Sequence, residues 1–508
     1  MPLARTRGVA LVGVEGHLVE VEADLGTGMP SYSLVGLPDA SLTESRDRVR
    51  AAMTNSDQHW PATKRVTVNL SPASLPKRGS SFDVAIAAAI LAAQGVVPQH
   101  AFDDAVLLGE LGLDGRLRST RGVLPAVIAA ARTGIRRVVV PAANLAEATL
   151  VPGLDVRGVA ELADLLAFLR GDPDRAVARP VARPRPERPG PDLRDVVGQA
   201  IGRRAVEVAG AGGHHLLFTG PPGSGKTMLA ERLPGVLPPL AVEEALEVTA
   251  VHSVAGLLAA DAPLVRRPPY QAPHHSASAA ALVGGGSRQA RPGAASLSHR
   301  GILFLDEAPE FQAGVLDALR QPLESGEVAI ARSGGVARYP ARFQLVMAAN
   351  PCPCAAPAGE AECRCTATAR RRYIGRISGP LLDRMDLQVQ LEPVVPGELL
   401  DGLDSAEPSA AVASRVAAAR AVAAERLRGT GWRINADVPG PVLRSRWRLP
   451  ATVTAAADVR LDRGELSARG YDRVLRIAWS VSDLAGQTRP TATDVDEAVA
   501  LRSHWSAR

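Results

Sequence analysis

Residues 215–229 read HLLFTGPPGSGKTML, and this stretch decides the fold class of the chain. An apolar, strand-like run at 216–218 leads into a glycine-rich loop, and a helical stretch begins directly after it. Glycines let consecutive backbone N–H groups point inward around a phosphate, at a helix N-terminus whose dipole favours anions. The loop alone would also fit an ordinary turn. The strand before it and the helix after it predict a phosphate-binding P-loop.

The residue types within this loop predict ATP and Mg²⁺ as cofactors. Lys226 is placed to reach the β- and γ-phosphates, and Thr227 is placed to offer its hydroxyl to the metal ion. We expect the nucleotide to be bound by Gly220, Pro221, Pro222, Gly223, Ser224, Gly225, Lys226, Thr227 and Met228.

Two further apolar runs end in polar residues that suit ATP hydrolysis. Residues 301–307 read GILFLDE and end in two carboxylates. Asp306 can bind Mg²⁺ and Glu307 can polarise the attacking water, the two tasks that phosphoryl transfer leaves to carboxylates. Asn350 directly follows the run 343–349, and its side chain can orient that water. Each run alone would fit a strand capped by solvated polar groups, but the P-loop favours the catalytic interpretation.

Composition divides the chain into four regions. Residues 1–170 alternate strand-like and alanine-rich helical runs, and residues 171–191 are rich in Pro and Arg, which is typical of an extended linker. Residues 192–396 again alternate strands, glycine-rich turns and helices, whereas residues 397–508 have a helical pattern. We therefore predict an α/β multidomain protein with an N-terminal α/β domain, a P-loop core built on a parallel sheet, and a C-terminal helical lid.

The motifs of the core resemble those of AAA+ ATPases that carry an extra insertion before the carboxylate strand. Essentially the whole chain resembles the YifB/ComM family of magnesium-chelatase-like proteins. The matching stretches are DVVGQ (195–199), APHHSASAAALVGGG (272–286), GILFLDEAPEF, LRQPLESGEVAIARSGG, AANPCPC and ISGPLLDRMDL (377–387).

This resemblance implies roles for two arginines. Arg384, in LLDRMDL, would be the arginine finger that reaches into a neighbour's active site, and Arg469, in LSARGYDRVLR, would be the lid arginine that touches the γ-phosphate. A homo-oligomeric ring, expected to be a hexamer, follows from the finger. A surface arginine is the alternative for each residue, because the chain is rich in arginine.

The amino-terminal region resembles the Lon-type protease fold. The resemblance lies in PKRGSSFDVAIAAAILAA (76–93) and GELGLDGRLRSTRGVLPAVIAAARTGIRRVVVP (109–141). It places Ser81 at the nucleophile position and Leu124 where the activating lysine belongs. A serine without a general base stays protonated and unreactive near neutral pH. We therefore expect a non-proteolytic scaffold.

All four cysteines lie within residues 352–365, directly after Asn350. Such clustering in a cytosolic chain argues against disulfides and favours a single tetrahedral zinc site formed by Cys352, Cys354, Cys363 and Cys365. The C-x-C spacing is tighter than the usual C-x-x-C. A thiol-rich loop without metal is therefore the alternative.

The distribution of charge is more informative than the formal net charge of +5. Three arginine-rich stretches also contain Tyr270, Tyr339 and Tyr373, and basic segments with interspersed aromatics can follow a phosphate backbone and stack on bases. Solvated loops are the alternative. The arginines are Arg266, Arg267, Arg288, Arg291 and Arg300 in 262–300, Arg332, Arg338 and Arg342 in 329–350, and Arg364, Arg370, Arg371, Arg372 and Arg376 in 363–378.

Two functions remain open on this evidence. The first is an ATP-driven ring motor on single-stranded or branched DNA, since the family resemblance implies DNA branch migration during natural transformation. The second is a protein-remodelling or chelatase-type ATPase, which acidic or aromatic pore loops would favour. The longest apolar run, 84–93, is too short to cross a bilayer and the amino terminus lacks a signal pattern, so we expect a soluble, cytoplasmic protein without membrane partners.

Overall fold

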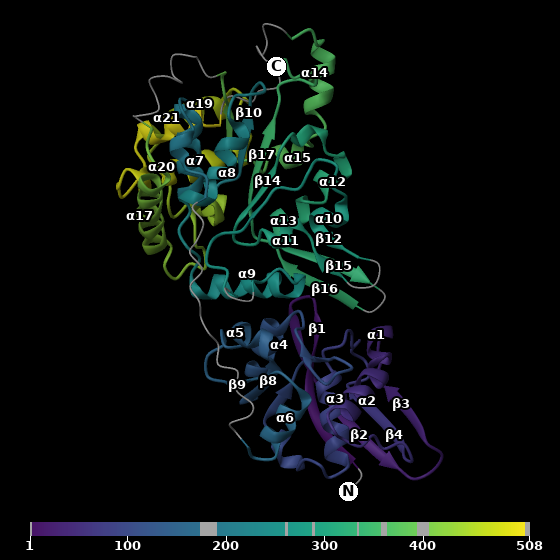
Figure 1. The fold of residues 1–508 in the computed structure, drawn as a ribbon. Helices are drawn as coiled ribbons and strands as arrows, with labels where there is room; N and C mark the ends of the chain where they lie inside the picture. Colours follow the sequence, from purple (N-terminus) through teal and green to yellow (C-terminus); the bar gives the residue numbers. More distant parts are fainter. Residues whose placement is uncertain are drawn as a thin grey trace.

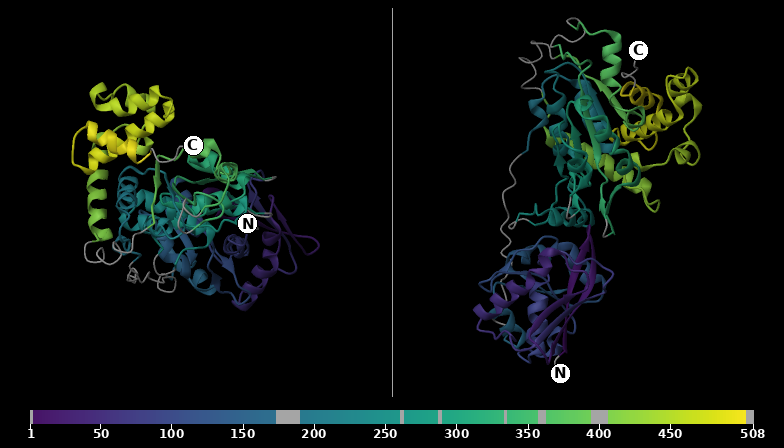
Figure 2. Two further views of the ribbon diagram at one scale, coloured as in Figure 1. Left: turned by 90° about the horizontal axis from the view of Figure 1, so that it is seen from above. Right: turned by 90° about the vertical axis from the view of Figure 1, so that its right-hand side faces the viewer.

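The structure is a computed structural model that describes residues 3–172, 190–259, 263–286, 290–332, 335–356, 363–393 and 406–502. The N-terminal region, in purple and blue, forms one end of the molecule, and the rest of the chain forms a larger body beyond it (Figures 1 and 2).

The N-terminal region contains two main sheets and a fully buried helix. The first sheet has the order β1-β2-β4-β3, with β3 and β4 parallel and the other pairs antiparallel; the second has the order β5-β8-β9 and is parallel. The apolar run 84–93 forms α3, which packs on β1 and β2 and is buried from its first residue to Leu91. The strands are β1 (Leu3–Val12), β2 (Glu15–Gly26), β3 (Ser31–Val35), β4 (Arg65–Ser71), β5 (Ala105–Leu107), β6 (Glu110–Leu111), β7 (Leu117–Arg118), β8 (Arg137–Pro141) and β9 (Asp155–Val159). The helices are α1 (Ala40–Thr43), α2 (Ser45–Asn55), α3 (Asp83–Ala93), α4 (Val123–Arg132), α5 (Leu145–Ala148) and α6 (Leu162–Leu169).

The central region is built on a five-stranded parallel sheet with the order β11-β14-β17-β10-β18. Its strands are short apolar runs, and β10, β14 and β17 are buried throughout, as a parallel sheet covered on both faces requires. The strands are β10 (Leu216–Thr219), β11 (Tyr270–Gln271), β14 (Ile302–Leu305), β17 (Gln344–Ala349) and β18 (Leu387–Gln390). The helices before the insertion are α7 (Ala200–Gly212), α8 (Lys226–Val236) and α9 (Val242–Ala255).

Smaller elements are inserted around β14 and after β17. The hairpin of β15 and β16 is antiparallel and lies toward the N-terminal region, whereas α14 lies at the opposite end of the molecule (Figure 1). These elements are α10 (Ala279–Val283), β12 (Gly284–Gly285), β13 (Arg291–Pro292), α11 (Ala294–Leu297), α12 (Ala313–Asp317), α13 (Arg320–Ser325), β15 (Glu327–Arg332), β16 (Gly335–Pro340), α14 (Ala367–Ile374) and α15 (Gly379–Leu382).

The C-terminal region is helical, as the sequence pattern predicts. Its longest helices, α17 and α20, pack against α7 of the central region, and Trp479 of α20 is buried in the shared core. The helices are α17 (Ser409–Leu427), α18 (Gly440–Arg444), α19 (Ala451–Asp462), α20 (Ala468–Leu484) and α21 (Ala492–Ala500). The predicted fold class, with α/β regions, a parallel sheet and a helical C-terminal region, is confirmed.

The N-terminal and central regions meet where α4 packs on α9, and polar contacts and a hairpin tip add to this junction. The N–H of Gly122 donates to the carbonyl oxygen of Ser253 (3.2 Å), and the Ser253 hydroxyl donates to the Glu147 carboxylate. Gly13, at the turn between β1 and β2, has φ +67° and lies so close to β16 that a Cβ would be 2.4 Å from the Arg338 carbonyl oxygen. Glycine is therefore required there. Among the described helices, none has the length and apolar character needed to span a membrane.

Candidate active site

The P-loop, the two predicted carboxylates and Asn350 lie at one edge of the central sheet, at the carboxyl ends of its strands. Thr219, the last residue of β10, pairs with Ala349 at the end of β17, and Leu305 of β14 pairs with Met347. The P-loop, Asp306 and Asn350 therefore follow the carboxyl ends of three neighbouring strands. Ligands bind at this edge of open parallel sheets.

The P-loop has the geometry of a phosphate cradle. Gly223 and Gly225 have φ values of +79° and +84°, which glycine adopts without strain. Lys226 begins α8, is buried, and donates from Nζ to the carbonyl oxygens of Gly220 and Pro221, each at 2.8 Å. The pKa of Lys226 is lowered by burial, which outweighs the opposite effect of the nearby carboxylates of Asp306 and Glu307.

The remaining loop residues surround this cradle. Pro221 and Ser224 are buried, Pro222 is exposed, and Met228 lies on the exposed face of α8. The loop therefore presents backbone N–H groups and the Lys226 ammonium, and this donor set fits the triphosphate of ATP.

Thr227 and Asp306 form a ready-made pair of oxygen ligands for magnesium. The Thr227 hydroxyl donates to Asp306 Oδ2 at 2.8 Å, and the other carboxylate oxygen accepts from the Glu307 N–H at 2.9 Å. Mg²⁺ is bound in nucleotide sites by one or two protein oxygens together with phosphates and water. Both residues therefore fit the expected ion.

Glu307 is exposed, and its carboxylate lies next to the imidazole of His275. Its backbone has φ +49°, a left-handed conformation that costs a non-glycine residue roughly 1 kcal/mol or more. Nδ1 of His275 lies 3.1 Å from Oε2 of Glu307. No sequence motif predicted a role for His275. It comes close because β11, which precedes it, pairs with β14, and this pairing was not visible in the sequence.

Arg384 and Arg469 line a cavity of about 310 Å³ at the other edge of the same sheet, which we call the arginine cavity. His215 and Asp386 also line it, and they immediately precede β10 and β18, so the cavity lies at the amino ends of the strands. The two ends of a four-residue strand such as β10 are roughly 13 Å apart. Neither arginine therefore shares the P-loop edge of its own chain.

Four arginines and three acids, Glu324, Asp383 and Asp386, line this cavity. Arg384 pairs with Glu324 and donates to the Pro380 carbonyl oxygen at 2.7 Å, whereas Arg469 is exposed. Burial lowers the pKa of Arg384, and the positive charges of neighbouring residues, Arg469 among them, lower it further. The arginines that line the cavity are Arg384, Arg469, Arg473 and Arg476.

A buried acid anchors the floor of this cavity. Burial disfavours ionisation of Asp386, but Arg473 and the other charges around it hold the pKa of the carboxyl well below its usual range. Its Oδ2 accepts from the His215 N–H at 2.9 Å. His214 is fully buried, its Nε2 lies 2.7 Å from the Ser480 hydroxyl, and burial lowers its pKa to about 4.

The four cysteines converge between β17 and α14. Their sulfur atoms all lie within 4.8 Å of one another, with Cys352 and Cys354 at 3.1 Å and Cys352 and Cys363 at 3.3 Å. A tetrahedral zinc ion with bonds of about 2.3 Å needs sulfurs about 3.8 Å apart. The four thiols therefore fit a zinc ion with small side-chain adjustments.

The structure corrects part of the interpretation of the arginine-rich stretches. Tyr339 and Tyr373 are buried, and Tyr270 stacks on Phe304, so these rings do not form a surface for bases. Arg338 pairs with Glu327, which lies just before the stretch 329–350. Arg288 lies outside the described residues.

Some arginines of these stretches form ion pairs, and several are exposed. Arg300 pairs with Glu244 and Glu247, and Arg376 pairs with Glu310. Exposed positions are Arg266, Arg267, Arg291, Arg332, Arg342, Arg364, Arg371 and Arg372.

Ser81 lies at the edge of a cavity, but position 124 offers it no base. Leu124 is fully buried, and its N–H donates to Glu147 at 2.8 Å. The expectation of a non-proteolytic scaffold stays a prediction.

Three family models match the chain. "Magnesium chelatase, subunit ChlI" matches residues 192–399, "Subunit ChlI of Mg-chelatase" matches 21–144, and "Magnesium chelatase, subunit ChlI C-terminal" matches 406–502. An uncharacterized protein of Mycobacterium tuberculosis is 56% identical over the full length of both chains.

Two further relatives also match over almost their whole length. Protein YifB of Salmonella typhimurium is 40% identical, with 99% of this chain and 97% of the relative covered. Competence protein ComM of Haemophilus influenzae is 39% identical, with 99% and 98% covered. A partial match, 28% identical over 32% of this chain, links it to Lon protease of Mycolicibacterium smegmatis.

Proposed function

Because the chain belongs to the YifB/ComM family of magnesium-chelatase-like AAA+ ATPases, we propose that it is an ATP-driven ring motor that acts on DNA in the cytoplasm. Its task would be that of a branch-migration helicase in recombination or natural transformation. The observation that carries the proposal is the separation of Arg384 and Arg469 from the P-loop of their own chain.

This separation favours a ring. Arginines at one edge of the sheet can complete a phosphate site at the other edge only in a neighbouring subunit. Such a head-to-tail interface satisfies every site when it closes, and a hexamer is the ring we propose. Both arginines would then act on the γ-phosphate of the neighbour's ATP, so the lid arginine would not act within its own chain.

Within one subunit, the residues have separate tasks in hydrolysis. Lys226 would bind the phosphates, and Thr227 and Asp306 would hold Mg²⁺, which neutralises phosphate charge when bound. Glu307 would accept the proton of the attacking water, with His275 setting its position and Asn350 orienting the water.

Support for DNA comes from charge and from a relative's name. Arg364, Arg371 and Arg372 are exposed on and beside α14, at the end of the molecule away from the N-terminal region (Figure 1). The cysteine cluster, for which we propose bound zinc, holds this basic helix in place. The name of the Haemophilus relative ties it to competence.

Protein remodelling is the second candidate, favoured by the partial similarity of the N-terminal region to Lon protease. ATPase rates with and without forked DNA across a salt series distinguish the two. DNA should stimulate the wild type, and Arg371→Ala with Arg372→Ala should reduce this stimulation and lower the salt dependence of binding by about two released counterions. Arg446→Ala with Arg463→Ala, which removes two exposed arginines of the lid, is the matched control. A ring that no DNA stimulates at any salt, but that a protein substrate does, would establish the second candidate.

A further inference from the structure

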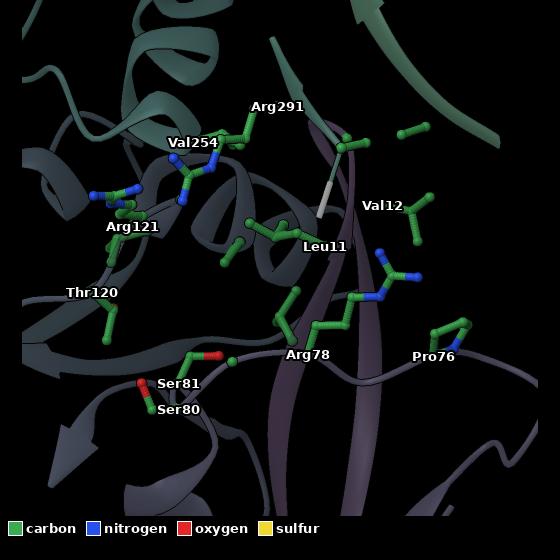
Figure 3. Close-up of a pocket in the computed structure, with 18 of the residues that line it drawn as sticks. Leu11, Val12, Pro76, Arg78, Ser80, Ser81, Thr120, Arg121, Val254 and Arg291 are labelled. Atoms are coloured by element: carbon green, nitrogen blue, oxygen red, sulfur yellow. The ribbon is translucent and has the colours of Figure 1, made fainter. Parts of the chain in front are cut away.

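A cavity of about 320 Å³ lies where the N-terminal region meets the central region. Figure 3 shows Arg78, Ser81, Arg121 and Arg291 around this space. Arg78 and Arg121 come from the N-terminal region, whereas Arg291 of β13 and Arg332 of β15 come from the central region. Residues of the P-loop do not line it.

The charges that line this cavity are unbalanced. Four arginines face one acid, Glu110, whose carboxylate already accepts a hydrogen bond from the Ser80 hydroxyl. Like charges that converge around one cavity repel one another, and this repulsion opposes the approach of the two regions. An anion bound between them would remove the repulsion.

Polar donors for an anion surround the same space. The hydroxyl-bearing residues Ser81 and Thr120 line it, and so does Val123, the first residue of the ten-residue helix α4. A helix N-terminus adds positive potential to that of the guanidinium groups. One first-turn donor is already used, because the Leu124 N–H donates to Glu147.

A purely structural role accounts for one of these arginines. The side chain of Arg121 lies against Gly256 at the C-terminus of α9, where a Cβ would be 2.6 Å from its Nε, and a cation there is favoured by the helix dipole. That contact does not explain why Arg291 and Arg332 line the cavity, since both are exposed and belong to the central region.

We propose that this cavity binds one phosphate-bearing ligand of about nucleotide size, held by arginines from both regions. Arginine forms two parallel hydrogen bonds to phosphate, and a cavity of about 320 Å³ lies at the small end of the range for ligand sites. The ligand is either a free nucleotide or a nucleotide unit of a nucleic acid strand. Binding would lock the N-terminal region onto the ATPase core without involving the P-loop.

The test uses the full chain carrying Lys226→Ala, which removes phosphate binding at the ATP site. Calorimetric titrations with inorganic pyrophosphate and with a short oligothymidylate separate the two sources of phosphate. Arg78→Gln and Arg291→Gln, one in each region, should each weaken binding about tenfold or more, as expected for the loss of a charge-assisted hydrogen bond. Arg132→Gln, an exposed change at the other end of α4, should leave binding unchanged.

Each result has one meaning for the proposal. Pyrophosphate binding that depends on both cavity arginines supports a free phosphate ligand, and binding of the oligonucleotide alone supports a strand. Thermal unfolding of each variant shows whether it is folded. If one variant is unfolded, the other cavity arginine of the same region, Arg121 or Arg332, is substituted in its place. Binding of neither probe, or binding that both folded arginine variants retain, overturns the proposal.

Discussion

Lys226 and Glu307 have separable effects on ATP, because one holds phosphate and the other acts on water. We expect Lys226→Ala to abolish nucleotide binding. Glu307→Gln removes the charge but keeps the shape, so it should keep ATP binding and slow turnover by roughly 100-fold or more. Calorimetry with ATP and steady-state ATPase rates measure the two effects. An equal loss of ATP affinity in both variants would contradict the role of Glu307.

Single residues of the site differ in how far the sequence predicts them. Spacing alone predicts the roles of Lys226, Thr227 and Asp306, because the P-loop and the carboxylate strand are local patterns. In the structure the Thr227 hydroxyl donates a hydrogen bond to Asp306. His275 lies 32 positions before Glu307 and meets it only because β11 joins the edge of the sheet next to β14. Local periodicity contains no information on that strand order.

At the scale of elements, buried apolar runs were the most predictable feature. The run 84–93 becomes α3 and the run 343–349 becomes β17, each within a residue of the predicted start. The arginine-rich stretches were less predictable because they fold into hairpins and helices whose partners come from outside the stretch. Glu327 neutralises Arg338 only because it lies across a hairpin.

The cysteine cluster yields a prediction for the element that joins β17 to α14. Purified protein should carry about one zinc ion per chain, and Cys352→Ser with Cys363→Ser should remove it. Elemental analysis measures the ion, and far-ultraviolet circular dichroism follows any loss of helix on chelation. Metal-free protein with normal folding and ATPase activity would leave the cysteines as loop residues without metal.

The contact between His214, which lies just before β10, and Ser480 of α20 predicts acid sensitivity. His214 is buried with a pKa of about 4, below its ordinary value of 6.5, so protonation favours the unfolded chain. The stabilising contribution is complete above pH 6.5 and is lost as the pH falls toward 4, by about 2 kcal/mol at pH 5.

Urea unfolding at pH 7.5 and pH 5 measures this sensitivity. Trp432, Trp447 and Trp479 lie in the lid or its core, so tryptophan fluorescence reports the relevant region. His214→Gln cannot be protonated and should show a smaller loss between the two pH values than the wild type. An equal loss in both proteins would show that another group controls acid unfolding.

At the scale of the whole molecule, the position of the arginine cavity predicts complementation between inactive subunits. Glu307→Gln subunits keep Arg384 and Arg469, whereas Arg384→Ala or Arg469→Ala subunits keep the P-loop and Glu307. Each variant alone should be inactive if every site needs both halves. In a ring mixed from equal amounts, about a quarter of the interfaces would join an intact P-loop to intact arginines, so activity should return to roughly that fraction of wild type.

The two arginine variants make this mixing experiment specific. Restoration by Arg384→Ala alone would place Arg469 at its own chain's nucleotide, because a subunit lacking an arginine that acts within its own chain cannot be rescued by a neighbour. Restoration by both variants is expected, since both residues line the cavity at the edge opposite the P-loop. Lys226→Ala mixed with Glu307→Gln is the matched control, because no interface in that ring contains an intact ATP site. Failure of either arginine variant to gain activity, with mixed rings verified by mass photometry, would contradict the head-to-tail arrangement for that residue.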